Sequence, residues 1–140
     1  MSTDPKDAGT FEATTISFSL TVKDLLKSVE WYHDIVGFSI ERRTEREGKL
    51  RSVTVNAGPA VRISLNQDDG AKGWDRIKGQ GFSFNIRTEE DIDELAKRIK
   101  AKGIILDMEP KDMSWGVRMI RLFDLDGYKI AISKPIEEKK

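Results

Sequence analysis

Residues 15–38 read TISFSLTVKDLLKSVEWYHDIVGF, and this stretch decides the fold. Its first eight residues alternate between apolar and hydroxyl side chains, which is the period of a half-buried strand. The apolar face consists of Ile16, Phe18, Leu20 and Val22. Over residues 24–36 the apolar spacing becomes helical, and Gly37 predicts a left-handed end to that helix. A strand followed by a helix therefore opens the fold.

Three more strands are expected after this helix. They cover residues 38–43, 49–56 and 60–66. Gly48 and the pair Gly58 and Pro59 separate them, as turn residues do. The first half of the chain therefore predicts the order β-α-β-β-β.

The same plan repeats after a loop over residues 67–80. Residues 82–86 alternate as a strand, and Thr88 is expected to cap a helix that ends before Gly103. The remaining strands are predicted over residues 104–106, 116–123 and 128–133. The predicted class is α+β, with two βαβββ modules forming an open eight-stranded mixed sheet curved around a cleft and helices on the outer face.

The domain boundaries follow from where apolar residues stop. One domain is expected over residues 12–134, with polar tails on either side of it. The segments are a disordered tail over 1–11, module one over 12–67, module two over 80–134 and a C-terminal tail over 135–140.

Composition limits the function classes. The 140 residues include 24 basic and 24 acidic side chains, so no field of one sign attracts nucleic acid or anionic lipid. The absence of cysteine excludes disulfides, thiolate metal sites and cysteine nucleophiles. No apolar stretch is long enough for a membrane span or a secretory signal, so a cytoplasmic location is expected.

Four motifs together resemble the vicinal oxygen chelate superfamily, which includes glyoxalases, bleomycin resistance proteins and extradiol dioxygenases. They are LTVKD (20–24), SVEWYHDIVGF (28–38), WGVR (115–118) and FDLDGYKI (123–130). The chain departs from the family pattern at Val36, Leu125 and Tyr128, where Leu, Pro and Asn are usual. The order and spacing of the motifs cover almost the whole chain, and the resemblance implies the two-module fold and a homodimer.

The family's enzymes hold a divalent metal with His, Glu or Gln from the first and last strands of each module. The matching positions here are Ser17, Gly81, either Arg62 or Ser64, and Ala131. None supplies an imidazole or a carboxylate, so neither a metal nor another cofactor is expected. The single histidine, His33, is interpreted as a solvent-side helix residue.

Strand parity predicts a second, polar face on the sheet. The candidate ligand-binding cleft consists of Ser17, Ser19, Thr54, Arg62, Ser64, Ser83, Asn85, Lys129 and Ala131, with Trp74 and Trp115 as aromatic walls. Such a surface suits a small organic ligand, including an aromatic one. The same alternation also occurs in any sheet with one face in water, and the tryptophans also suit packing or dimer contacts.

Three hypotheses remain open at this point. The first is a metal-independent small-molecule binding protein of the resistance or sequestration type. The second is a lyase, isomerase or oxygenase with a non-standard or absent metal, in which Lys129 or Arg62 would be the only charged groups in the cleft. The third is a dimeric interaction protein whose cleft the partner subunit closes.

Overall fold

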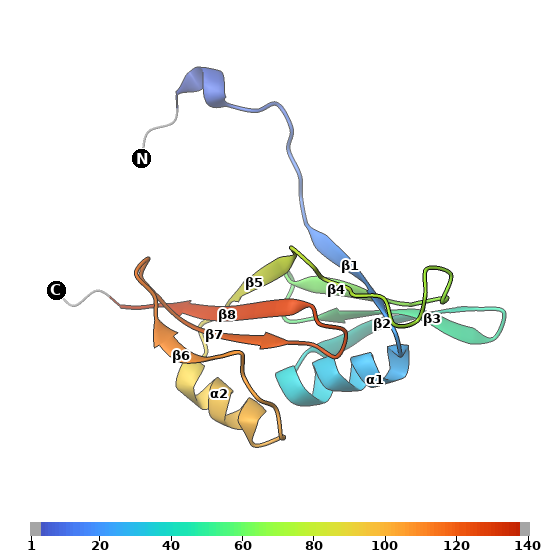
Figure 1. The fold of residues 1–140 in the computed structure, drawn as a ribbon. Helices are drawn as coiled ribbons and strands as arrows, with labels where there is room; N and C mark the ends of the chain where they lie inside the picture. The colour runs from blue at the N-terminus through green and yellow to red at the C-terminus, as the bar shows by residue number, and fades with distance from the viewer. Residues whose placement is uncertain (1–3, 138–140) are drawn as a thin grey trace.

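The computed structural model describes residues 4–137, and two βαβββ modules follow one another along them (Figure 1). The first module contains β1 (Ser17–Val22), α1 (Leu25–Glu30) with a π-helical continuation (Trp31–Val36), β2 (Ser39–Arg46), β3 (Lys49–Asn56) and β4 (Arg62–Gln67). The second contains β5 (Ser83–Arg87), α2 (Ile92–Lys100), β6 (Met108–Asp112), β7 (Val117–Phe123) and β8 (Lys129–Pro135).

The strands form two mixed sheets of four, one for each module. The strand orders are β1-β4-β3-β2 in the first sheet, called sheet A, and β5-β8-β7-β6 in the second, called sheet B. In each sheet the first strand runs parallel to the last, and the other neighbours are antiparallel. The predicted α+β class is confirmed, with its eight strands divided into two hydrogen-bonded sheets.

Both helices begin at an aspartate. The carboxylate of Asp24 accepts a hydrogen bond from the backbone N–H of Lys27, and that of Asp91 does the same for Glu94. The prediction that Thr88 caps the second helix is therefore wrong, because Asp91 lies directly before the first turn. The predicted left-handed stop at Gly37 is confirmed by its φ of 103°.

The strand predicted over residues 104–106 is wrong. Leu106 is buried and Ile105 is 92% exposed, so this apolar run crosses the edge of the core as a loop. The strand β6 follows it instead and pairs with β7 across a register shift. Its sequence, MEPKD, has no apolar alternation, and Pro110 suits an edge strand.

One apolar core spans both modules. Ile63 and Leu65 of β4 and Ile130 and Ile132 of β8 belong to the same buried cluster as the inner faces of α1 and α2. These four residues are buried on the helix side, as their parity predicts. Ile16 is exposed because β1 begins one residue after it.

Only part of each predicted tail lies within the described residues. Pro5–Asp7 form a single 3₁₀ turn, and the segment between it and β1 projects away from the sheets (Figure 1). The tail positions 1–3 and 138–140 lie outside the described residues. Within residues 4–137, no helix has the length and apolarity needed to cross a membrane.

Candidate functional site: a cleft beside sheet B

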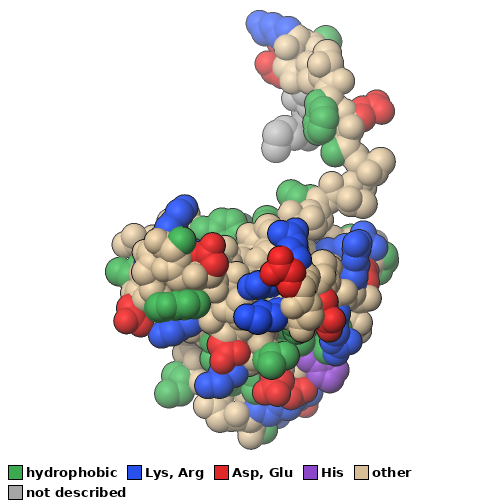
Figure 2. All heavy atoms as spheres, turned by 90° about the vertical axis from the view of Figure 1, so that its right-hand side faces the viewer, with side chains coloured by type: hydrophobic (Ala, Val, Ile, Leu, Met, Phe, Trp, Pro, Cys, Tyr) green, Lys and Arg blue, Asp and Glu red, His purple; other side chains and the backbone are tan. Residues whose placement is uncertain are grey.

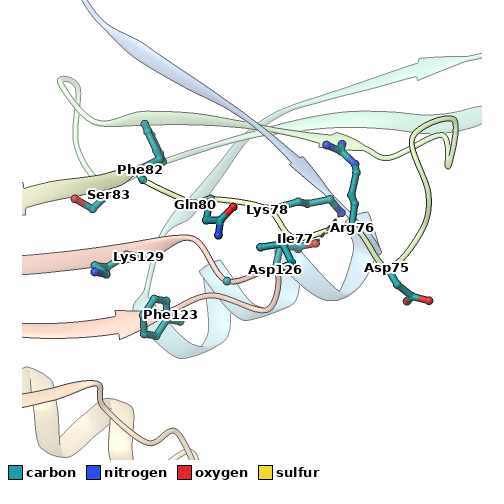
Figure 3. A pocket seen from close by; sticks show the side chains of 13 residues that line it. Asp75, Arg76, Ile77, Lys78, Gln80, Phe82, Ser83, Phe123, Asp126 and Lys129 are labelled. Atoms are coloured by element: carbon teal, nitrogen blue, oxygen red, sulfur yellow. Dashed lines mark hydrogen bonds and ion pairs between the residues drawn. The ribbon is translucent and has the colours of Figure 1, made fainter.

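A cleft of about 740 Å³ lies between the segment that connects the modules and one end of sheet B. Residues 75–82 form one wall, and the ends of β5, β7 and β8 form the other (Figure 3). Side chains from three strands and a loop therefore meet in a volume that suits a small organic ligand.

Strand register places three cleft residues in one row across sheet B. Ser83 of β5 lies opposite Lys129 of β8, and Lys129 lies opposite Phe123 of β7. Neighbouring strands are about 5 Å apart, so a hydroxyl, an ammonium and a phenyl group lie side by side on the face away from the helices. Strand parity predicted Ser83 and Lys129 on this polar face, and both line the cleft.

Two phenylalanines supply the apolar part of the lining. Phe123 is 45% exposed and Phe82 is 37% exposed. The Lys129 Nζ atom lies 5.8 Å from the Phe123 ring centroid, within range of a cation–π contact. The Phe82 ring packs edge-on against Tyr128, with centroids 6.4 Å apart, which holds the ring at the cleft wall.

A buried lysine fixes the connecting segment in place. The Nζ atom of Lys78 lies 3.1 Å from Asp68 and 3.2 Å from Asp126, and all three side chains are at most 5% exposed. Burial opposes the ammonium charge, but hydrogen bonds to both carboxylates outweigh it and raise the pKa of Lys78. The hydrogen bond from the Gly70 backbone, with that from Lys78, lowers the pKa of Asp68. The cleft wall is therefore tied to both modules.

The β7–β8 turn forms the other side of this junction. Asp124 accepts hydrogen bonds of 2.9 Å from the backbone N–H groups of Asp126 and Tyr128, which is the reason for an aspartate at the start of this tight turn. The Tyr32 hydroxyl of the first module donates to the other Asp124 oxygen at 2.5 Å. Burial raises the pKa of both Asp124 and Tyr32.

The candidate residues from the first module lie on sheet A, away from the cleft. Ser17 pairs in register with Arg62, and Ser64 pairs with both Ser19 and Thr54. Two of them bond neighbouring side chains. The Arg62 guanidinium donates to Glu41 at 3.0 Å, and Ser19 accepts from Asn66 at 2.8 Å. Figure 2 shows basic and acidic side chains interspersed over the face that it presents.

The remaining candidates on sheet B do not line the cleft. Asn85 is exposed and lies opposite Ala131. Ala131 is buried beside Val117 and Met119, so the open face of this sheet carries an apolar patch further along. Its methyl group is covered by this cluster and offers no hydrogen bond to a ligand.

The two predicted aromatic walls are also outside the cleft. Trp74 is 51% exposed and lines a separate pocket of about 450 Å³ with Leu125. Its ring covers Gly70, where an added Cβ would lie 2.4 Å from the indole, so glycine permits this contact. Trp115 is 64% exposed in the turn between β6 and β7. Phe82 and Phe123 take the wall positions instead.

The donor set does not fit the metal that the family resemblance implies. Ser17 and Arg62 face each other across β1 and β4, and Ala131 is buried among apolar side chains. Within residues 4–137, no three His, Cys, Asp or Glu side chains gather as a metal site. His33 is exposed on its helix and contacts Asp34 at 2.7 Å, as a solvent-side residue does. A hydroxyl and a guanidinium are poor ligands for a divalent ion.

Comparison with known proteins identifies relatives along nearly the whole chain. Residues 14–132 match the family model described as Glyoxalase/Bleomycin resistance protein/Dioxygenase superfamily. A probable lactoylglutathione lyase of Synechocystis sp. is 30% identical over 125 residues, covering 86% of this chain and 94% of that protein. One of Vibrio cholerae is 30% identical over 118 residues, covering 81% and 84%.

Solved structures share the fold. TnmS3, described as an antibiotic binding protein from Streptomyces sp. CB03234, superposes with a TM-score of 0.72 at 23% identity, covering 91% of this chain and 99% of TnmS3. A glyoxylase/bleomycin resistance protein/dioxygenase domain from Frankia sp. EAN1pec also gives 0.72, at 19% identity, covering 92% and 96%.

Proposed function

Since this chain belongs to the glyoxalase/bleomycin resistance protein/dioxygenase superfamily, we propose that it binds a small organic molecule in the cleft beside sheet B, without a metal ion. The observation that carries the proposal is the lining of that cleft. Two partly exposed phenyl rings stand beside a few polar groups, which is the composition of a ligand pocket.

The anchoring of the cleft supports this function. Lys78 is held between Asp68 and Asp126, and the β7–β8 turn is held by Asp124. A wall fixed by buried ion pairs loses little conformational freedom when a ligand arrives, so less of the interaction energy is lost to ordering. The antibiotic-binding description of TnmS3 agrees with a binding role for a protein of this fold.

A second candidate is a lactoylglutathione lyase type of enzyme. The two relatives that are 30% identical are both named as probable lactoylglutathione lyases. That chemistry in this family relies on a divalent metal, and the residues at the corresponding positions here are Ser17, either Arg62 or Ser64, Gly81 and Ala131. Their side chains favour the binding function over the enzyme.

Metal content and ligand binding separate the two candidates. Protein purified without chelator is incubated with nickel, iron, manganese or zinc, desalted and analysed by plasma mass spectrometry. We expect metal well below one ion per chain in every case. One retained ion per chain, with activity on the hemithioacetal of methylglyoxal and glutathione, would establish the enzyme instead.

The binding proposal has its own test. A library of small organic molecules is screened by chemical-shift changes in ¹⁵N-labelled protein, and binders are retested on Phe123→Ala and Thr54→Ala. We expect the shifts to gather at residues 75–83 and 123–129, with affinity lost in Phe123→Ala only. Shifts confined to sheet A would place the site on that sheet and not in the cleft. The predicted homodimer and cytoplasmic location remain predictions.

A further inference from the structure

We propose that the ligand of this cleft is a planar aromatic molecule with one negative charge, such as a carboxylate, whose anion contacts Lys129 and whose ring contacts Phe123. The inference rests on the proposed binding function and names its ligand class. It follows from which charges in the cleft already have partners and which one lacks a partner.

The cleft contains three cations and two carboxylates. Lys78 pairs with Asp68 and Asp126, and Arg76 lies 3.5 Å from Asp68. The second carboxylate, Asp75, lies 3.0 Å from Lys23. Four of the five charged groups therefore have a partner of opposite sign.

Lys129 is the exception. Within residues 4–137 it takes part in no ion pair, and its Nζ atom lies 5.8 Å from the centroid of the Phe123 ring. An ammonium with no carboxylate beside it, at the centre of a row with a hydroxyl on one side and a phenyl on the other, attracts an anion. One free cation matches one negative charge.

The surrounding groups define the rest of the ligand. Phe123 lies beside Lys129 at the sheet B wall of the cleft, where a flat aromatic ring can contact it, and Phe82 lies at the rim with its ring pointing away from Lys129 (Figure 3). Ser83 and Gln80 add uncharged hydrogen-bonding groups. A polyanion such as a nucleotide phosphate would leave charges unpaired, because Arg76 and Lys78 are already engaged.

Three naphthalene probes test the charge rule with one ring system. They are 2-naphthoate, methyl 2-naphthoate and 2-naphthylmethylammonium, each titrated by calorimetry and by ¹⁵N chemical shifts. We expect naphthoate to bind about tenfold more tightly than the ester and the ammonium probe to bind weakest, because one charge-assisted hydrogen bond separates them.

Two lysine variants assign the effect. Lys129→Met is expected to weaken naphthoate binding about tenfold and leave ester binding unchanged. Lys134→Met is the matched control, because Lys134 lies on the same strand with its side chain in a different pocket, beside Arg118. This control is expected to keep the affinity for naphthoate.

The outcomes separate the inference from the proposed function. If the ester and naphthoate bind equally, lose affinity in Phe123→Ala and ignore Lys129→Met, the binding function stands and the anion inference is overturned. If naphthoate binding falls equally in both lysine variants, general charge attraction explains it and the inference is overturned as well. If none of the probes binds at millimolar concentration and the library screen also yields no binder, both fail.

Discussion

The two sheets carry similar rows of side chains with different partners. At the first residue of its last strand, sheet A has Arg62 between Ser17 and Asn56, and sheet B has Lys129 between Ser83 and Phe123. Each row thus has a serine, a cation and a third residue. The difference lies in the third residue and in what neighbours the cation.

In sheet A a carboxylate already pairs with the cation. Glu41 accepts hydrogen bonds from Arg62 at 3.0 Å and from Asn56 at 3.4 Å. In sheet B the cation faces a phenyl ring, and the connecting segment adds a second wall. The comparison teaches that the same module plan leaves the cation paired with a carboxylate in one copy and beside an open cleft in the other.

The largest expected effect comes from removing the anchor of the second wall. Lys78→Met leaves Asp68 and Asp126 buried without their ammonium partner, so we expect the free energy of unfolding to fall by about 3 kcal/mol. Urea unfolding followed by tryptophan fluorescence measures this. Lys72→Met, at an exposed position of the same segment, should change it by less than about 0.5 kcal/mol. Equal effects in the two variants would show that the anchor does not matter.

The next effect concerns the contacts that hold the two modules together. Tyr32→Phe leaves one oxygen of the buried Asp124 without its donor, and we expect a loss of about 2 kcal/mol. Tyr128→Phe removes a hydrogen bond to the neutral carbonyl of Thr21 and should cost about 1 kcal/mol. Thermal unfolding of both variants checks the ranking, and a reversed ranking would contradict the role of the charged acceptor.

A third prediction concerns acid. The folded-state pKa of Asp68 lies below its unfolded value of about 3.9, so its stabilisation is present above that pH and is lost as the pH falls through the folded pKa. Asp68→Asn should therefore flatten the loss of stability below about pH 4, as measured by urea midpoints from pH 2.5 to 6. Asp69→Asn, at an exposed neighbour, should retain the slope of the unmodified protein.

The smallest expected effect comes from making the row of sheet A resemble the row of sheet B. Glu41→Gln frees Arg62, and adding Asn56→Phe supplies a ring beside it, so the double variant should show a second, weak site for 2-naphthoate. Chemical shifts at Ser17 and Ser64 would report it. Glu45→Gln, on the same strand, is the control and should show one site. The absence of any second site would mean that the connecting segment, not the row, creates the cleft.

The fold was predictable because its signals are local. Alternation in residues 15–22 and glycine after each helix depend on near neighbours only, and β1 and Gly37 confirm them. The strand β6 lacked such a signal, since its five residues are held by pairing with β7. Residues 104–106 showed the opposite error, because an apolar run does not reveal whether it is a strand or a core-crossing loop.

The site was predictable only in part, for reasons of geometry. Parity placed Ser83 and Lys129 on the open face, and their register brings them together. Phe82 was not among the predicted cleft residues, and it lines the rim because it lies in the connecting segment directly before β5. Nothing in the local sequence pairs Lys78 with Asp126, because these residues meet only once the modules pack.

The contacts of Asp126 also bear on how the chain is made. This residue lies in the last hairpin, yet it accepts hydrogen bonds from the Lys23 backbone at 2.8 Å and from Lys78 at 3.2 Å. During synthesis both donors leave the ribosome well before their acceptor does. Lys23 and Lys78 therefore lack this carboxylate partner until Asp126 has been synthesised. We expect nascent chains that stop before residue 126 to be open to proteases and chaperones.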